Sequence, residues 1–374
     1  MKYLDLKAIN APYEHAADEV LRSGWYLHGE ATHRFEQHYA EYIGTRHCVG
    51  CANGLDALTL ILRAYKELGR LKDGDEVIVP ANTYIATILS ITENALVPVL
   101  VEPSIDSLQI DDTLIEQAIT PRTRAIMIVH LYGRCAYTPL IGDLCQRHNL
   151  LLIEDNAQAH GCLSASAATV LQPRLTGSLG HAAAHSFYPT KNLGAFGDAG
   201  AVTTDDDELA DMVRTLGNYG SARHYIFDHL GRNSRLDELQ AAILDAKLPH
   251  LDASNARRRE IAAIYINNVK HPDIAILKPQ ISNLKPQTSN VYHIFPVLSP
   301  RRDELKQYLA DHDIQTEIHY PIPPHQQRCY PQLAHLHLPI TERIHREELS
   351  LPCNPAMTDD DAHRISELLN AFPR

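Results

Sequence analysis

Lys191 and Asp155 have the residue types and surroundings of a catalytic pair. Asp155 ends the run 150–155, which is typical of a buried strand, and Lys191 follows in a loop of small residues. A lysine amine can form a Schiff base with the aldehyde of pyridoxal phosphate, and a carboxylate can hold the pyridinium proton that makes the ring an electron sink. We therefore expect pyridoxal 5′-phosphate as the cofactor, with Lys191 and Asp155 as its catalytic residues.

The neighbours of Lys191 distinguish it from an ordinary solvated lysine. Ser186 offers a hydroxyl to a phosphate group, and the segment 194–200 is a loop with little side-chain bulk. Tyr84 is our candidate for stacking on the cofactor ring. The sequence leaves open a second role for Tyr84, as a core residue at the start of a helix.

A phosphate site is expected where the segment 53–58 follows the first strand and opens a helix. Free amides and the helix dipole favour an anion there, and Gly54 lets the backbone approach closely. An ordinary helix cap by Asn53 or Asp56 is the alternative. Gln158 would lie one turn beyond Asp155, within reach of the cofactor, and His160 is a candidate for supporting that contact.

The acidic composition limits the possible partners. A formal net charge of −12 argues against nucleic acid or an anionic membrane, although a local site can still bind a small anion. Nowhere do about 18 uncharged apolar residues run together, as a spanning helix would require. We expect a cytoplasmic protein.

Cys48 and Cys51 form a CxxC motif, for which a redox or zinc site is the alternative to a buried strand. We favour buried thiols, because no second CxxC is present and the flanking residues suit a strand. Seven cysteines without an export signal fit reduced thiols. The 22 histidines include no HExxH motif, so no metal site is expected.

Apolar runs alternate with helical patterns between about residues 47 and 205, which predicts an α/β fold with a doubly wound, mostly parallel sheet. The predicted strands are 47–52, 76–80, 97–101, 125–130, 150–155, 183–187 and 201–204, and the predicted helices are 56–68, 85–93, 113–119 and 139–148. Ligands of such sheets collect at the carboxyl ends of the strands. Asn53, Asp155 and the segment 186–191 should therefore converge on one crevice.

The pattern changes after residue 235. Helices are predicted at 235–246, 255–269, 303–312 and 359–370, and a strand at 291–298. We divide the chain into a large cofactor-binding domain, 1–250, and a smaller C-terminal α+β domain, 251–374.

Several stretches together resemble the DegT/StrS family of pyridoxal phosphate-dependent sugar aminotransferases. They are 54–58, 74–80, 129–133, 154–161, 186–194, 233–242 and 319–321, and the resemblance covers nearly the whole chain. It implies the aspartate aminotransferase-like fold type I and a homodimer with active sites at the interface. It also implies L-glutamate as the amino donor and a nucleotide-linked keto sugar as the acceptor.

The resemblance also assigns roles to single residues. Lys191 matches the Schiff-base lysine, Asp155 the pyridinium partner and Gln158 a neighbouring cofactor contact. The implied phosphate contacts are Gly54, Leu55, Ser186 and, from the other subunit, Asn233.

Positions on the sugar-nucleotide side match Tyr188, His319 and Tyr320. Leu55 stands where many members have threonine, which removes one side-chain phosphate contact. His224 stands where lysine is common, and Arg223 is a substitute for substrate binding there. The segment 165–176 looks like a local insertion.

The resemblance suggests amino transfer to C3 of a dTDP-linked keto-6-deoxyhexose, supplying a 3-amino-3,6-dideoxy sugar for surface polysaccharide such as lipopolysaccharide O-antigen. Transfer to C4 is the alternative regiochemistry. A sugar dehydratase of the same fold is disfavoured, since those relatives replace the Schiff-base lysine by histidine and Lys191 is present. A non-catalytic regulator is a further alternative, and it predicts no spectral response to glutamate.

Overall fold

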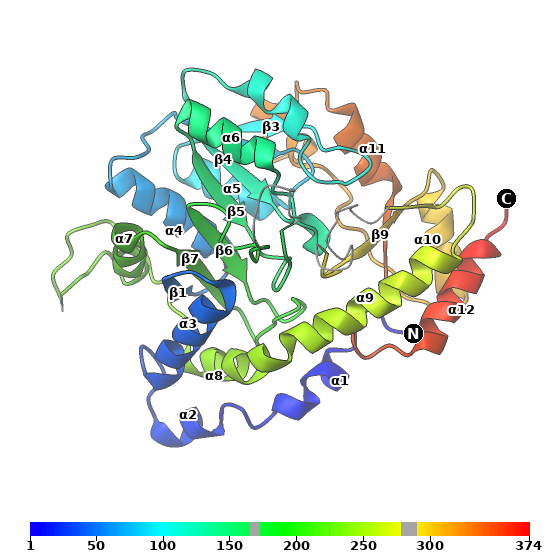
Figure 1. The fold of residues 1–374 in the computed structure, drawn as a ribbon, viewed down its shortest axis with the longest axis horizontal. Coiled ribbons are helices and arrows are strands. Elements are labelled where there is room, and N and C mark those ends of the chain that lie inside the picture. The colour runs from blue at the N-terminus through cyan, green and yellow to red at the C-terminus, as the bar shows by residue number, and fades with distance from the viewer. Residues whose placement is uncertain (165–172, 224, 278–289) are drawn as a thin grey trace.

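A seven-stranded sheet forms the centre of the larger part of the molecule (Figure 1). The computed structural model describes residues 1–164, 173–223, 225–277 and 290–374. The strand order is β1-β7-β6-β5-β4-β2-β3, and neighbours run parallel except β7, which is antiparallel to both β1 and β6. The strands are β1 (His47–Cys51), β2 (Glu76–Pro80), β3 (Val97–Val101), β4 (Thr123–Val129), β5 (Leu151–Asp155), β6 (Ala182–Ser186) and β7 (Gly200–Thr204).

Both faces of this sheet are buried, because successive strand residues point to opposite sides. Val77 and Val79 pack into one apolar core, and Ile78 between them packs into another. The first core includes α4 (Gly54–Glu67), α5 (Ile85–Glu93) and α7 (Asp207–Gly217). The other face is covered by α6 (Pro139–His148), α3 (Glu30–Ile43) and α8 (Glu238–Lys247).

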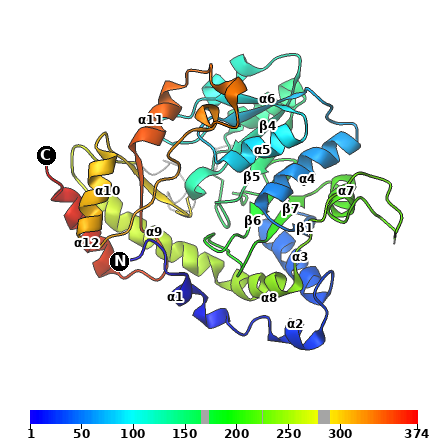
Figure 2. The ribbon, with the colours of Figure 1, turned by 180° about the vertical axis from the view of Figure 1, so that it is seen from behind.

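A second, three-stranded antiparallel sheet lies in the C-terminal part of the chain. Figure 2 shows that the two ends of the chain lie on the same side of the molecule. Its order is β10-β9-β8, with β8 (Ala275–Ile276), β9 (Phe295–Leu298) and β10 (Glu348–Leu351). Its core includes α9 (Leu251–Asn268), α10 (Arg302–Asp311) and α12 (Asp359–Asn370). The remaining α-helices are α1 (Leu6–Asn10), α2 (Asp18–Ser23) and α11 (Pro339–Glu347). Figure 1 shows α9 running from α8 to α12, so this helix joins the two sheets.

Two helices are capped at their amino ends by carboxylates that lie far from them in the sequence. Glu238 accepts hydrogen bonds from the amides of Gly29, Ala31 and Thr32 at the start of α3. Glu102, just after β3, accepts hydrogen bonds from two amides of the first turn of α11. Unpaired amides at a helix start favour a negative charge, so these contacts fix how the helices sit on the sheet.

Two predicted elements differ from the structure. The predicted helix 113–119 is a pair of 3-10 turns, Asp112–Leu114 and Glu116–Ala118. The amides of Ile115, Ala118 and Ile119 bond to carbonyls three residues earlier in the chain, which is the 3-10 pattern, and Ile119 itself is extended. The predicted strand 291–298 is shortened to Phe295–Leu298, because Val291 and Ile294 donate their amides to the 3-10 turn Leu131–Gly133 and its neighbourhood instead.

The CxxC cysteines lie on opposite faces of β1. Cys48 packs in the core with α3, and Cys51 packs in the core with α4. Both thiols are free and buried, and burial raises their pKa values. The interpretation as core residues is therefore confirmed. Among the helices of the described residues, none has both the length and the apolar character to cross a membrane.

Candidate functional site

A cavity of about 470 Å³ lies where the carboxyl ends of β5 and β6 meet the first turn of α4. Asp155 ends β5, Ser186 ends β6, and Gly54 begins α4, so the topology itself brings them together. Predicted site residues that line the cavity are Gly54, Leu55, Tyr84, Asp155, Gln158, Ser186, Tyr188, Lys191, His319 and Tyr320. The predicted convergence at the strand ends is thus present.

Lys191 and Asp155 face this cavity without forming an ion pair with each other within 4 Å. Burial lowers the pKa of Lys191 to about 8, although the negative charge of Asp155 acts in the opposite direction. An amine with this pKa is partly neutral near neutral pH and can react with an aldehyde. Lys191 and Asp155 therefore both line the cavity and do not pair with each other.

Asp155 is held by two hydrogen bonds that leave it facing the cavity. Its Oδ2 accepts from the Thr87 hydroxyl at 2.8 Å, and its Oδ1 accepts from the amide of Ala157 at 3.2 Å. Burial raises the pKa of Asp155, and these two donors and Lys191 oppose that rise. A cationic ring nitrogen beside Asp155 would stabilise its ionised form.

The amino end of α4 and the end of β6 approach closely at Gly54. A Cβ built on Gly54 would lie 2.5 Å from the Cβ of Ser186, so a larger residue cannot occupy this position without a shift of the backbone. Asn53 caps the helix by accepting a hydrogen bond from the Asp56 amide. The cap and the anion site are compatible, because Gly54 and Leu55 of the first turn line the same cavity as Ser186.

Tyr84 and Tyr320 form an aromatic wall, with ring centroids 4.9 Å apart. Tyr84 lies at the start of α5 and is 50% exposed, so its alternative role as a core residue is wrong. Gln158 donates its Nε2 to the Tyr320 hydroxyl at 3.1 Å and accepts the Tyr132 amide through its Oε1. These bonds fix the Gln158 amide at the cavity edge.

His160 lies behind the cavity and is fully buried. Within the described residues neither of its ring nitrogens has a hydrogen-bond partner. Burial, and then the positive charge of Lys191, lower its pKa to about 3, so its ring is neutral. It packs against Phe187 at a ring distance of 5.4 Å and thereby supports the loop that carries Lys191.

Two of the predicted site residues do not line this cavity. Asn233 and Arg223 are exposed and do not line it, and His224 lies outside the described residues, as does the segment 165–172 of the predicted insertion. Conversely, Thr190 and His293 line the cavity but were not predicted as site residues from the sequence. A histidine within an apolar run was the available signal for His293, whose Nδ1 lies 3.2 Å from Oδ1 of Asn192.

The residues of this cavity fit pyridoxal phosphate. A reactive amine and a buried carboxylate face a shared space, and helix amides with a serine hydroxyl provide a place for a phosphate. Within the described residues no group of three His, Cys, Asp or Glu residues could hold a metal ion.

Known proteins resemble the chain along its whole length. The model of the DegT/DnrJ/EryC1/StrS aminotransferase family matches residues 8–370. The dTDP-3-amino-3,6-dideoxy-alpha-D-galactopyranose transaminase of Aneurinibacillus thermoaerophilus is 49% identical, with 99% of both chains covered. The structure of S. venezuelae DesV in complex with a ketimine intermediate has a TM-score of 0.91 at 43% identity, covering 99% of this chain and 98% of that one. The structure of NtdA from Bacillus subtilis with bound PMP has a TM-score of 0.86 at 29% identity, covering 100% and 85%.

Proposed function

We propose, since the chain belongs to the DegT/DnrJ/EryC1/StrS aminotransferase family, that it transfers the amino group of L-glutamate to C3 of a dTDP-linked keto-6-deoxyhexose. The family is pyridoxal phosphate-dependent, and the chain is an aminotransferase of this type. The observation that carries the proposal is the pair Lys191 and Asp155, which face one cavity without pairing with each other. The choice of C3 and of a dTDP sugar is supported by the name of the relative that is 49% identical.

When bound, pyridoxal phosphate supplies an electron sink for negative charge at the carbon that carries the amino group. Asp155 would hold the proton on the ring nitrogen, which would keep that sink effective. Lys191 is placed to take a proton from the donor carbon and to return one to the acceptor carbon, because its lowered pKa leaves part of the amine neutral. Gly54, Leu55 and Ser186, which line the cavity, would bind and orient the phosphate.

The acceptor sugar would occupy the side of the cavity formed by Tyr188, His319 and Tyr320. Tyr188 is 51% exposed and lines the cavity, which places it at the entrance from solvent. Tyr320 is oriented by Gln158, and the Tyr132 hydroxyl donates to the carbonyl of His319 at 2.6 Å. These contacts present a fixed surface to a sugar ring.

We propose that a partner subunit contributes further residues to each site. Exposed apolar side chains are prominent in the segment that precedes Asn233: Tyr225, Phe227 and Leu230 are 79%, 58% and 83% exposed. Such side chains favour burial against another protein surface. A homodimer would bury them and could bring Asn233 and Arg223 to the partner's cavity.

The acceptor assignment is tested by product analysis. Purified protein is incubated with glutamate and each keto sugar nucleotide, and NMR locates the new nitrogen. Nitrogen at C3 supports the proposal, whereas nitrogen at C4 contradicts the regiochemistry. Absence of any spectral change with glutamate would contradict the enzymatic function and favour a regulator.

The shared site is tested by mixing two inactive variants. Lys191→Ala and Asn233→Asp subunits are unfolded, mixed and refolded together. A hybrid dimer contains one site with both native residues, so activity should return to a fraction of the wild-type value. If the mixture stays as inactive as the separate variants, Asn233 does not act across the interface.

A further inference from the structure

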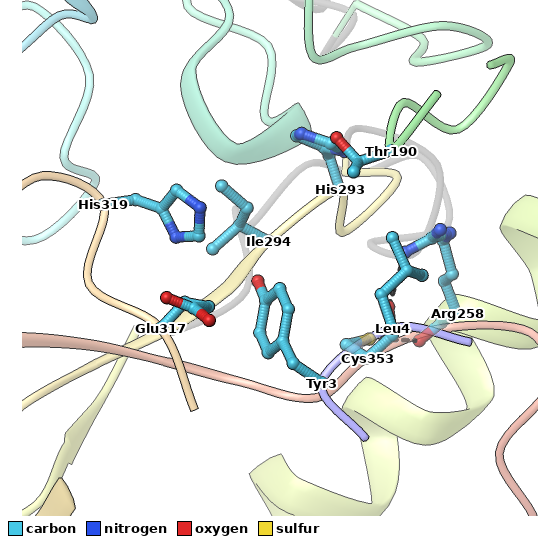
Figure 3. Close-up of a pocket in the computed structure, with 9 residues that line it drawn as sticks. All are labelled: Tyr3, Leu4, Thr190, Arg258, His293, Ile294, Glu317, His319 and Cys353. Atoms are coloured by element: carbon cyan, nitrogen blue, oxygen red, sulfur yellow. Dashed lines mark hydrogen bonds between the residues drawn. The ribbon is translucent and has the colours of Figure 1, made fainter. Parts of the chain in front are cut away.

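A second cavity, of about 260 Å³, lies beside the first (Figure 3). The two cavities share Thr190, His293, Ile294 and His319 as a common wall. The other walls of the second cavity come from the N-terminal segment, from α9 and from the C-terminal strands and loops: Tyr3, Leu4, Arg258, Glu317 and Cys353. The chemistry described above assigns no role to this space.

Arg258 gives this cavity a buried positive charge. Its side chain projects from α9 and the residue is 3% exposed. Its Nη1 donates to the backbone carbonyls of Tyr292 and Cys353, while its Nε has no hydrogen-bond acceptor within the described residues. A buried charge is costly unless an opposite charge or a full set of hydrogen bonds compensates it.

No carboxylate of the described residues lies within 4 Å of the Arg258 guanidinium. The undescribed positions, 165–172, 224 and 278–289, contain neither Asp nor Glu. Glu317 also lines the cavity, but Figure 3 shows the Tyr3 ring standing between Glu317 and the wall that carries Arg258. The chain itself therefore leaves the positive charge of Arg258 without a carboxylate partner.

His293 stands in the wall that the two cavities share. Burial depresses the pKa of His293, and the positive charges of Lys191 and Arg258 depress it further. His293 lines both cavities, whereas Lys191 lines only the first and Arg258 only the second. A ligand that reached from one cation to the other would need an amino-bearing carbon at one end and an anion at the other.

We propose that the second cavity binds the side-chain carboxylate of the amino donor through Arg258, while the donor amino group lies at Lys191. A guanidinium matches a carboxylate in shape and can donate two parallel hydrogen bonds to it. Arg258 would thereby select a dicarboxylic amino acid over a neutral one. The inference rests on the proposed function, because it names the group that recognises the donor.

The wild-type holoenzyme provides the first test. L-Glutamate is compared with L-2-aminopentanoate, which has the same carbon chain without the distal carboxylate, and the loss of the cofactor's visible absorbance is followed. We expect the half-saturating concentration of glutamate to be about 10- to 100-fold lower than that of 2-aminopentanoate. This factor corresponds to the contribution of a charge-assisted hydrogen bond. Equal half-saturation by the two amino acids would overturn the proposal without any variant.

Arg258→Gln and Arg258→Lys supply the second test. Binding of glutarate, which cannot react, is measured by calorimetry on the holoenzyme. Arg258→Gln should weaken it by about 10- to 100-fold and reduce the preference for glutamate over 2-aminopentanoate by a similar factor, whereas Arg258→Lys should retain part of both. If Arg258 had only a structural role, Arg258→Gln would change the half-saturating concentrations of glutamate and 2-aminopentanoate by the same factor. The preference for glutamate would then be unaltered.

Arg257→Gln is the matched control on the same helix. Arg257 pairs with Glu260 and Asp359 and does not line the cavity, so its loss should not alter glutarate binding. If Arg258→Gln does not fold, Arg258→Lys and the wild-type comparison still decide. If the acceptor sugar were assigned wrongly, the expected effect of Arg258→Gln on glutarate binding would be unchanged. If Arg258→Gln bound glutarate as tightly as the wild type, only the proposed role of Arg258 would be contradicted.

Discussion

Glu154 and Asp155 are neighbours at the end of β5, but their carboxylates have opposite surroundings. Glu154 is fully buried and accepts four hydrogen bonds, from His130 at 2.8 Å and from the amides of Gly177, Leu179 and Gly180. Burial acts to raise its pKa, but these donors together lower it. Asp155 accepts two hydrogen bonds, and its pKa is raised by burial.

Glu154 is thus a structural carboxylate, whereas Asp155 is a reactive one. The donors around Glu154 are supplied by the chain, so its ionised form is stabilised as soon as the protein folds. Asp155 faces a cavity and accepts only two hydrogen bonds from the chain, so a cationic ring nitrogen beside it would stabilise its charge further. The reactive carboxylate has fewer hydrogen-bond donors from the chain than its buried charge requires, whereas the structural carboxylate has a full set.

Lys191→Ala should have the largest effect on the reactive side. Loss of the amine removes both covalent attachment of the cofactor and proton transfer, so kcat should fall by about 10⁴-fold or more. Folding should be unimpaired, because the variant removes a charge that burial disfavours. Steady-state kinetics and thermal melts measure the two quantities, and activity within tenfold of wild type would contradict the role of Lys191.

Glu154→Gln should mainly affect stability. The side-chain amide of glutamine has one acceptor oxygen, so its nitrogen would face backbone N–H donors that no longer have a partner. We expect the free energy of unfolding to fall by about 3 kcal/mol. Urea unfolding measures this, and a change below about 1 kcal/mol would show that the four hydrogen bonds are not needed for stability.

Asp155→Asn should show the reverse pattern. The Thr87 hydroxyl can rotate to accept a hydrogen bond from asparagine, so the free energy of unfolding should change by less than about 1 kcal/mol. Turnover should fall by about 10²- to 10³-fold, because a neutral amide cannot stabilise the ring proton. If Glu154→Gln and Asp155→Asn changed stability equally, the distinction between the two sites would be wrong.

The pH dependence of Lys191 should give the smallest effect. Its folded-state pKa is lowered to about 8 from 10.5, so the unfolded state binds more protons between these values. The stability of the apoprotein should therefore rise with pH across this window relative to Lys191→Met, by about 1–3 kcal/mol. Labelling of the apoprotein by an aldehyde and borohydride should increase through about pH 8. An increase only near pH 10 would place Lys191 in solvent.

Most of the large sheet could be predicted from the sequence. Parallel strands buried on both faces are short apolar runs between turns, and Glu76–Pro80 and Val97–Val101 have the predicted bounds. The helices α3 and α7 were not predicted, although both are amphipathic. The predicted helix 113–119 is wrong, because its amides bond to carbonyls three residues earlier in the chain and form two short 3-10 turns.

The part of the site that depends on strand ends was predictable, and the part that depends on tertiary contacts was not. Asp155 and Ser186 follow from the rule that ligands lie at the carboxyl ends of parallel strands. His293 lies in a segment that was predicted as strand, and its approach to Asn192 depends on the packing of two distant loops. No periodicity in the sequence links Tyr3 to Arg258.

The contacts of Gln158 have a further consequence. Gln158 bonds to both Tyr132 and Tyr320, and the Tyr132 hydroxyl bonds to the carbonyl of His319, so the C-terminal wall of the cavity is tied to the large sheet before any ligand arrives. The conformational entropy of this wall is lost once, during folding, and not in every turnover. Ligand entry should therefore proceed by a simple one-step association, without a slow rearrangement of these loops.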